Sequence, residues 1–225
     1  MKNLCYGSVC SGVESATLAW ESLGWQSVWF AETAPFPSAV LHHHWPHVPN
    51  LGDMTRLAGL ISRGDVAAPD ILVGGTPCQA FSIAGLRGSL SDARGNLTLE
   101  FVRIFDAIDA VRRRGGKSPA VAVWENVPGV LNTHDNAFGC FLAGLVGEEL
   151  PLEPAGRKWT DAGCVFGPQR RIAWRVLDAQ YFGLPQRRRR VFLVASARDL
   201  DPAEILFERH REAGDSAPGR DSRQK

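Results

Sequence analysis

The stretch Val73-Gly74-Gly75-Thr76-Pro77-Cys78-Gln79-Ala80-Phe81-Ser82 continues a short strand-like segment at residues 70–73, in which an apolar run follows Asp70. The apolar run predicts a buried strand, which the glycines and the proline end in a tight turn. A cysteine in such a turn lies at the carboxyl end of a strand, where open α/β sheets place their functional groups. Free cysteines are often buried and inert, and Cys5, inside an apolar run, fits that description. The polar, loop-forming neighbours of Cys78 favour a reactive thiol.

Strand and helix patterns alternate on both sides of this stretch. The sequence predicts strands at residues 4–9, 27–31, 48–51, 71–73, 120–124, 172–177 and 190–195, and helices at residues 13–23, 35–44, 56–63, 97–114 and 138–150. The alternation predicts a doubly wound α/β fold with a mostly parallel sheet. The connection at residues 178–190 is too short for a crossover helix, so the last strand is expected to be antiparallel. We expect one catalytic domain at 1–207 and a disordered polar tail at 208–225.

Composition argues against several classes of protein. No apolar run approaches the roughly 20 residues of a membrane span, and the first residues do not form a signal peptide. Five cysteines without a C-x-x-C pair argue against a disulfide framework and a zinc site. We therefore expect a cytoplasmic protein that binds neither membrane nor metal. The formal net charge is only +1, but eight arginines gather at residues 170–198. This basic run suits phosphate groups or is a solvated face.

The amino-terminal segment has the order of a nucleotide-binding half-fold. A small-residue loop at residues 10–12 follows the first strand, and Glu32 ends the second strand. In such units the loop faces an anionic group and the acid binds ribose hydroxyls. A plain βαβ unit explains the pattern nearly as well, because the loop has a single glycine. Ser11 and Glu14 also form the S-x-x-E pattern of a helix capping box.

Three motifs carry a resemblance to a known family. They are Thr76-Pro77-Cys78-Gln79-x-Phe81-Ser82, Glu125-Asn126-Val127 and Gln186-x-Arg188-x-Arg190. In this order and at these spacings, the chain resembles the DNA (cytosine-5) methyltransferases over residues 4–196. The resemblance implies methyl transfer from S-adenosylmethionine to C5 of a flipped-out cytosine in DNA. The family usually continues into a target-recognition domain and a last conserved segment, so the resemblance implies a C-terminally short member. Either a second polypeptide supplies the rest, or the chain is truncated, or the protein is a catalytic relic.

The resemblance also implies a role for each motif residue. Cys78 would add to C6 of cytosine, Glu125 would bind N3 and the amino group, and Arg188 would hold the target nucleotide. The implied cofactor-binding residues are Cys10, Ser11, Gly12, Val13, Glu32, Asp53, Met54 and Pro77, and the implied DNA-binding residues are Gln79, Ser82, Gln186 and Arg190.

Glu14 departs from the family pattern. Many members have glycines where this chain has Glu14 and Ser15. An acid there would lie near the methionine carboxylate and weaken cofactor binding unless it turned away into the capping box. Two other functions use the same residues: a catalytically silent protein that keeps the cofactor- or DNA-binding scaffold, and an RNA cytosine-5 methyltransferase.

Overall fold

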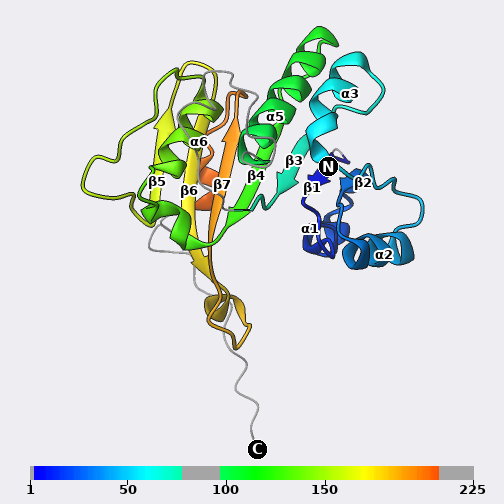
Figure 1. The fold of residues 1–225 in the computed structure, drawn as a ribbon, viewed down its shortest axis with the longest axis horizontal. Coiled ribbons are helices and arrows are strands. Elements are labelled where there is room, and N and C mark those ends of the chain that lie inside the picture. Colours follow the sequence, from blue (N-terminus) through cyan, green and yellow to red (C-terminus); the bar gives the residue numbers. More distant parts are fainter. Residues whose placement is uncertain (1–2, 78–96, 208–225) are drawn as a thin grey trace, which may run out of the picture.

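A seven-stranded sheet forms the centre of the protein (Figure 1). The computed structural model describes residues 3–77 and 97–207. The strands are β1 (Cys5–Val9), β2 (Gln26–Ala31), β3 (Ile71–Gly74), β4 (Val121–Asn126), β5 (Ala162–Phe166), β6 (Arg171–Asp178) and β7 (Arg189–Ser196), in the order β2-β1-β3-β4-β7-β6-β5. The first four pair in parallel, and β7, β6 and β5 add in antiparallel fashion. Five of the seven strands therefore run in one direction, which confirms the predicted mostly parallel sheet with an antiparallel last strand.

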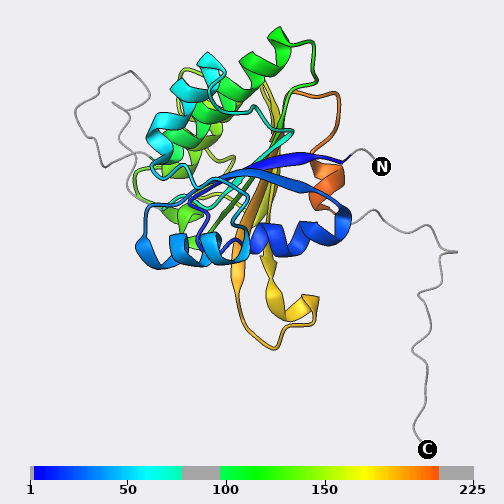
Figure 2. The same cartoon turned by 90° about the vertical axis from the view of Figure 1, so that its right-hand side faces the viewer.

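Helices cover both faces of this sheet. They are α1 (Ser15–Trp20), α2 (Pro35–His44), α3 (Leu57–Arg63), α5 (Leu97–Arg114), α6 (Ala137–Val146) and α7 (Ala203–Leu206), with 3-10 turns η1 (Glu21–Leu23), η2 (Met54–Arg56), η3 (Pro128–Asn132) and η4 (Ala179–Phe182). Figure 2 shows α3 and α5 on one side of β1 and β2, and α1 and α2 on the other. Apolar residues recur on one face of α5, and Phe101, Ile104, Phe105 and Ile108 are fully buried there. This two-sided covering is the doubly wound arrangement that the sequence predicts.

Several predicted boundaries are wrong for local reasons. The strand expected at residues 48–51 is reduced to one bridge between Phe30 and Asn50, since Pro49 has no N–H to donate to a ladder. The helix expected at residues 138–150 ends at Val146, because Gly147 takes a φ of 83°. The sequence prediction missed β5 and α7. β5 is an edge strand of mixed small and apolar residues, so its hydrophobic pattern is weak.

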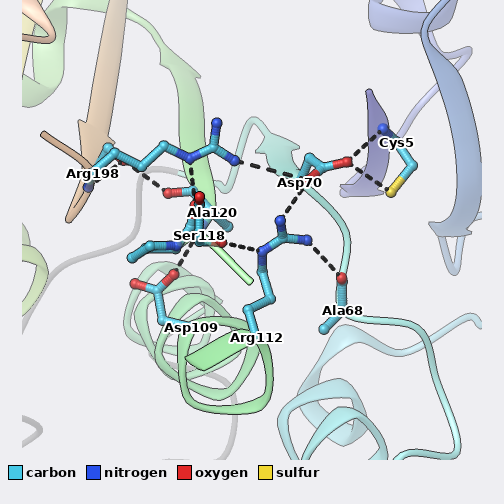
Figure 3. A network of polar contacts seen from close by, with 10 residues as sticks. Cys5, Ala68, Asp70, Asp109, Arg112, Ser118, Ala120 and Arg198 are labelled. Atoms are coloured by element: carbon cyan, nitrogen blue, oxygen red, sulfur yellow. Dashed lines mark hydrogen bonds and ion pairs between the residues drawn. The ribbon is translucent and has the colours of Figure 1, made fainter. Parts of the chain in front are cut away.

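A polar network joins β1, β3 and α5 at the amino-terminal edge of the sheet (Figure 3). Asp70 accepts a hydrogen bond from the Cys5 backbone N–H (3.1 Å) and pairs with Arg112 Nη2 at 2.5 Å. Arg112 also donates to the carbonyl oxygens of Ala68 and Ser118. Burial raises the pKa of the Asp70 carboxyl, but hydrogen bonds from Cys5 and the Arg112 guanidinium outweigh it, so this pKa lies below its ordinary value. We call this group of residues the amino-edge clamp.

The arginines of residues 170–198 do not form one basic surface. Arg170 is buried, pairs with Asp106 at 2.7 Å and Asp109 at 2.8 Å, and lies over the Phe105 ring. Arg198 lies at the amino edge, with Nη2 3.9 Å from Asp70 Oδ1. The sequence shows only that these arginines are near one another along the chain. In the fold, Arg170 and Arg198 flank the start of β6 and the end of β7, whereas Arg188 and Arg190 lie at the opposite end of this strand pair.

Among the described residues, no helix is both long and apolar enough to cross a membrane.

Candidate active site

A cavity of about 670 Å³ lies at the carboxyl edge of the parallel strands. Its wall includes the β1–α1 loop, the end of β3, and Glu125 at the end of β4. The β6–β7 hairpin adds Arg188 and Arg190, and η4 lies at the far end of this hairpin, below the rest of the sheet (Figure 1). Because parallel strands bring their carboxyl ends to one edge, motifs far apart in the sequence meet in this cavity.

The β1–α1 loop is held against the end of β2. Ser11 Oγ donates to the Ser8 carbonyl (3.1 Å) and accepts from the Ala31 N–H (3.2 Å). The Gly12 N–H donates to Glu32 Oε2 at 2.9 Å. Gly12 has a φ of 56°, and no atom lies within 4 Å of the position that a Cβ would take. The predicted cofactor residues Ser11, Gly12 and Glu32 therefore form one connected unit with an open backbone face.

The other predicted cofactor residues have different surroundings. Cys10 Sγ lies 3.6 Å from Met54 Sδ, and burial followed by the nearby Glu32 raises the pKa of this thiol to about 11. Cys10 is thus a neutral, apolar contact. Asp53 is exposed and caps η2 by accepting from the Thr55 N–H at 2.9 Å. The cavity lining includes Cys10 and Ser11, whereas the other predicted cofactor residues (Gly12, Val13, Glu32, Asp53, Met54 and Pro77) do not line it.

Glu14 does not form the expected capping box. It is itself the N-cap of α1, with a φ of 63°, and its Oε1 accepts from the Thr17 N–H at 3.2 Å. Ser11 Oγ is engaged elsewhere, and Glu14 N donates to the Ser11 carbonyl. The left-handed backbone turns the Glu14 carboxylate inward, and the residue is only 1% exposed.

Glu125 and two arginines form the charged wall of the cavity. Arg190 Nε lies 2.9 Å from Glu125 Oε1, and Arg188 Nη2 lies 3.9 Å from the same oxygen. The Glu125 side chain keeps 35% of its surface exposed. A Cβ on Gly75 would lie 3.1 Å from Glu125 Oε2, so the loop after β3 passes close to this carboxylate. The second and third motifs therefore meet, as the resemblance implies.

A buried hydroxyl fixes the residues just before Cys78. Thr76 Oγ1 accepts from Trp124 Nε1 (2.9 Å) and lies 2.8 Å from Thr98 Oγ1. Asn126 Nδ2 donates to the Thr76 carbonyl at 2.8 Å. The sequence analysis missed this role of Thr76, although a buried indole N–H needs an acceptor and Trp124 directly precedes Glu125.

Three predicted site residues, Cys78, Gln79 and Ser82, lie outside the described residues, as does the predicted tail at 208–225. Gln186 is exposed on the β6–β7 hairpin. Within the described ranges, no group of three or more His, Cys, Asp or Glu residues could hold a metal ion.

Comparison with known proteins identifies the family. The family model described as C-5 cytosine-specific DNA methylase matches residues 6–218, and the chain belongs to this family. A protein of Escherichia phage P1, named DNA N-6-adenine-methyltransferase, is 60% identical over 92% of this chain and 30% of its own length. The Type II methyltransferase M.NlaIV of Neisseria lactamica is 33% identical over 78% of the chain and 36% of its own length. The chain thus spans about a third of these relatives.

Solved structures agree on the fold. A crystal structure of a mutant of Spodoptera frugiperda DNMT2 superposes with a TM-score of 0.59 at 19% identity, covering 93% of this chain and 53% of that one. The cofactor of this family is S-adenosylmethionine, and the cavity fits it. Its volume lies within the range of about 300–1,000 Å³ that small-molecule sites occupy. Its wall holds the buried carboxylate of Glu14, which has no cationic partner among the described residues.

Proposed function

We propose that this chain is the catalytic domain, at 1–207, of an enzyme that transfers the methyl group of S-adenosylmethionine to C5 of cytosine in DNA. The observation that carries the proposal is the meeting of Glu125, Arg188 and Arg190 with the β1–α1 loop in one cavity. A carboxylate for the base and a loop for the cofactor must share one space if a methyl group is to pass between them.

In the proposed reaction, Cys78 is the nucleophile. Its thiolate adds to C6 of a cytosine that has left the duplex, which makes C5 electron-rich enough to attack the methyl group. A base then removes the C5 proton and the C6–S bond breaks, which releases 5-methylcytosine and the free thiol. Thr76 supports this step, because its buried contacts with Trp124 and Asn126 fix the backbone that leads to Cys78.

Glu125 binds N3 and the amino group of the flipped cytosine in this proposal. Arg190, at 2.9 Å, orients the carboxylate through Oε1, which leaves Oε2 for the base. Arg188 approaches the same oxygen only to 3.9 Å and is 49% exposed, so its guanidinium has donors free for the oxygen or phosphate of the target nucleotide. Gln79, Ser82, Gln186 and Arg190 are proposed to complete the DNA contacts.

The experiment is a covalent trap. Incubation with S-adenosylmethionine and a duplex that contains 5-fluorocytosine should give a protein–DNA adduct, because fluorine at C5 cannot be removed as a proton. The adduct should be absent in Cys78→Ala and present in Cys164→Ala, whose cysteine is exposed on the edge strand β5. An adduct that survives Cys78→Ala would show that another residue is the nucleophile.

The name of the phage P1 relative supports a second candidate, methylation of adenine at N6. The adenine amino group can attack a methyl group directly and needs no thiolate. Analysis of the methylated nucleosides separates the two functions. If N6-methyladenine is the product and Cys78→Ala retains the activity, the adenine candidate replaces the cytosine proposal.

A further inference from the structure

Glu14 is the carboxylate of the cavity wall that has no cationic partner. The described residues that line the cavity include two acids, Glu14 and Glu125, and two bases, Arg188 and Arg190. Both arginines lie beside Glu125. Glu14 Oε1 accepts from Thr17 N (3.2 Å) and Thr17 Oγ1 (3.3 Å), whereas its buried Oε2 has no hydrogen-bond partner.

An unpartnered carboxylate oxygen of this kind destabilises a folded chain. A buried charged acceptor that is left unpaired loses its hydration without a compensating hydrogen bond. Burial raises the pKa of Glu14, and the nearby Ser8 hydroxyl and the Thr17 hydrogen bonds offset this only in part. The backbone adds a second cost, because a non-glycine residue at a φ of 63° is strained. A cavity residue that combines an unpaired buried charge with a strained backbone is typical of a ligand-binding residue.

The position of Glu14 along the cavity identifies the part of the cofactor that it faces. Glu32, proposed to bind the ribose, lies outside the cavity lining, whereas Glu125, proposed to bind the cytosine, lies within it. The transferred methyl group must point toward the cytosine, so the sulfur and the amino-acid branch attached to it occupy the cavity. In this part of the cofactor, the α-ammonium group is the hydrogen-bond donor, since the sulfonium and the carboxylate carry no N–H or O–H.

We propose that Glu14 binds the α-ammonium group at the methionine end of S-adenosylmethionine. This inference rests on the proposed function and makes the acid at position 14 a binding residue. The ammonium donates to Oε2 and compensates the buried charge, while Oε1 continues to cap α1. Because Oε2 is almost fully covered, the β1–α1 loop adjusts as the cofactor enters, and the open space around Gly12 gives it room.

The test is calorimetric binding to the 225-residue chain with four ligands. S-adenosylmethionine and S-adenosylhomocysteine carry both the amino and the carboxylate group. Decarboxylated S-adenosylmethionine keeps only the amino group, and 5′-methylthioadenosine lacks both. Glu14→Gln keeps an oxygen for Thr17 and loses the charge. Glu21→Gln, an exposed acid outside the cavity lining, is the matched control.

We expect Glu14→Gln to weaken the first three ligands roughly tenfold to a hundredfold, the range for a charge-assisted hydrogen bond. Binding of 5′-methylthioadenosine should not change, which also shows that the variant is folded, and Glu21→Gln should bind all four like the wild type. Equal loss for all four ligands would assign Glu14 to helix capping alone, and no loss would remove it from the site. If Glu14→Gln leaves the binding of S-adenosylhomocysteine unchanged, the partner of Glu14 is the sulfonium. If it leaves the binding of decarboxylated S-adenosylmethionine unchanged, the effect depends on the ligand carboxylate. Either result overturns the inference. A wild type that binds none of the four overturns the methyltransferase proposal itself.

Discussion

The two opposite edges of the sheet each carry a carboxylate beside arginines: Asp70 at the amino edge and Glu125 at the carboxyl edge. The edges differ in the other contacts that these arginines make. At the amino edge, Arg112 is 6% exposed and donates to Asp70 and to two backbone carbonyl groups. At the carboxyl edge, Arg188 is 49% exposed and reaches Glu125 only at 3.9 Å. A buried arginine that donates from each of its three nitrogens holds the fold together, whereas an exposed one with free donors can bind a ligand.

This contrast teaches that an ion pair by itself does not mark a site. The Arg112–Asp70 pair is the shorter of the two, yet its surroundings are closed by backbone groups (Figure 3). The Glu125 pair borders a cavity of about 670 Å³. We therefore expect the amino edge to determine stability and the carboxyl edge to determine activity.

Glu125→Gln should have the largest effect. We expect methyl transfer to fall about 10²–10⁴-fold, because the amide cannot accept a proton or stabilise positive charge on the base. The melting temperature should stay unchanged, since the side chain is 35% exposed. A radiolabelled methyl-transfer assay beside a thermal melt measures both. A variant that loses stability in parallel with activity would make Glu125 a part of the fold rather than a catalytic residue.

Arg112→Ala should show the opposite pattern. Removing the close partner of a largely buried ion pair leaves Asp70 with only the more distant Arg198, at 3.9 Å, as a cation. We expect a loss of about 3 kcal/mol in the free energy of unfolding. Urea unfolding measures it. Arg113→Ala, an exposed neighbour in the same last turn of α5, is the control and should change little. Equal stability of the two variants would contradict the clamp.

Thr76→Val should affect both properties, since Thr76 connects the core to the segment that carries the proposed nucleophile Cys78. Loss of the hydroxyl leaves Trp124 Nε1 without its acceptor, and we expect a loss of about 2 kcal/mol in unfolding free energy. Methyl transfer should fall as well, because the backbone before Cys78 is released. Thr76→Ser keeps the hydroxyl and should restore both. Full activity in Thr76→Val would show that these contacts only stabilise the core.

Gly75→Ala should change activity with little effect on stability. The new Cβ would lie 3.1 Å from Glu125 Oε2, so the carboxylate must shift by a few tenths of an ångström. We expect a roughly tenfold slower transfer from that misplacement. Gly59→Ala, on the exposed face of α3, is the control. It should leave transfer unchanged and add at most about 1 kcal/mol of stability.

The pH dependence of Asp70 should give the smallest effect. Its pKa is lower in the folded chain than the unfolded value of about 3.9. The stability contributed by this carboxylate is therefore complete above about pH 4 and is lost as the pH falls through the folded pKa. Urea midpoints between pH 2.5 and 6 should show this loss in the wild type and a smaller one in Asp70→Asn. Identical pH profiles would mean that the clamp does not depend on the charge of Asp70.

The sequence by itself determined the sheet class, the helix at 97–114 and the three motifs, of which the second and third meet at one edge. These features depend on local patterns: apolar periodicity, glycines that end elements, and polar residues directly after strands. The weak edge strand β5 escaped the prediction because its five residues have little pattern of their own. The strand expected at residues 48–51 was wrong, since one proline removed the donor that a ladder needs.

Only the tertiary structure decided which charged residues share a cavity and which are buried as pairs. The sequence places Arg170 and Arg198 in one basic run with Arg188 and Arg190, but the fold buries the first against Asp109 and sends the second to the opposite edge. It also turns Glu14 inward, where the local pattern indicated a capping box. The physical reason is that the environment of a charge depends on residues distant in sequence, which local patterns do not report.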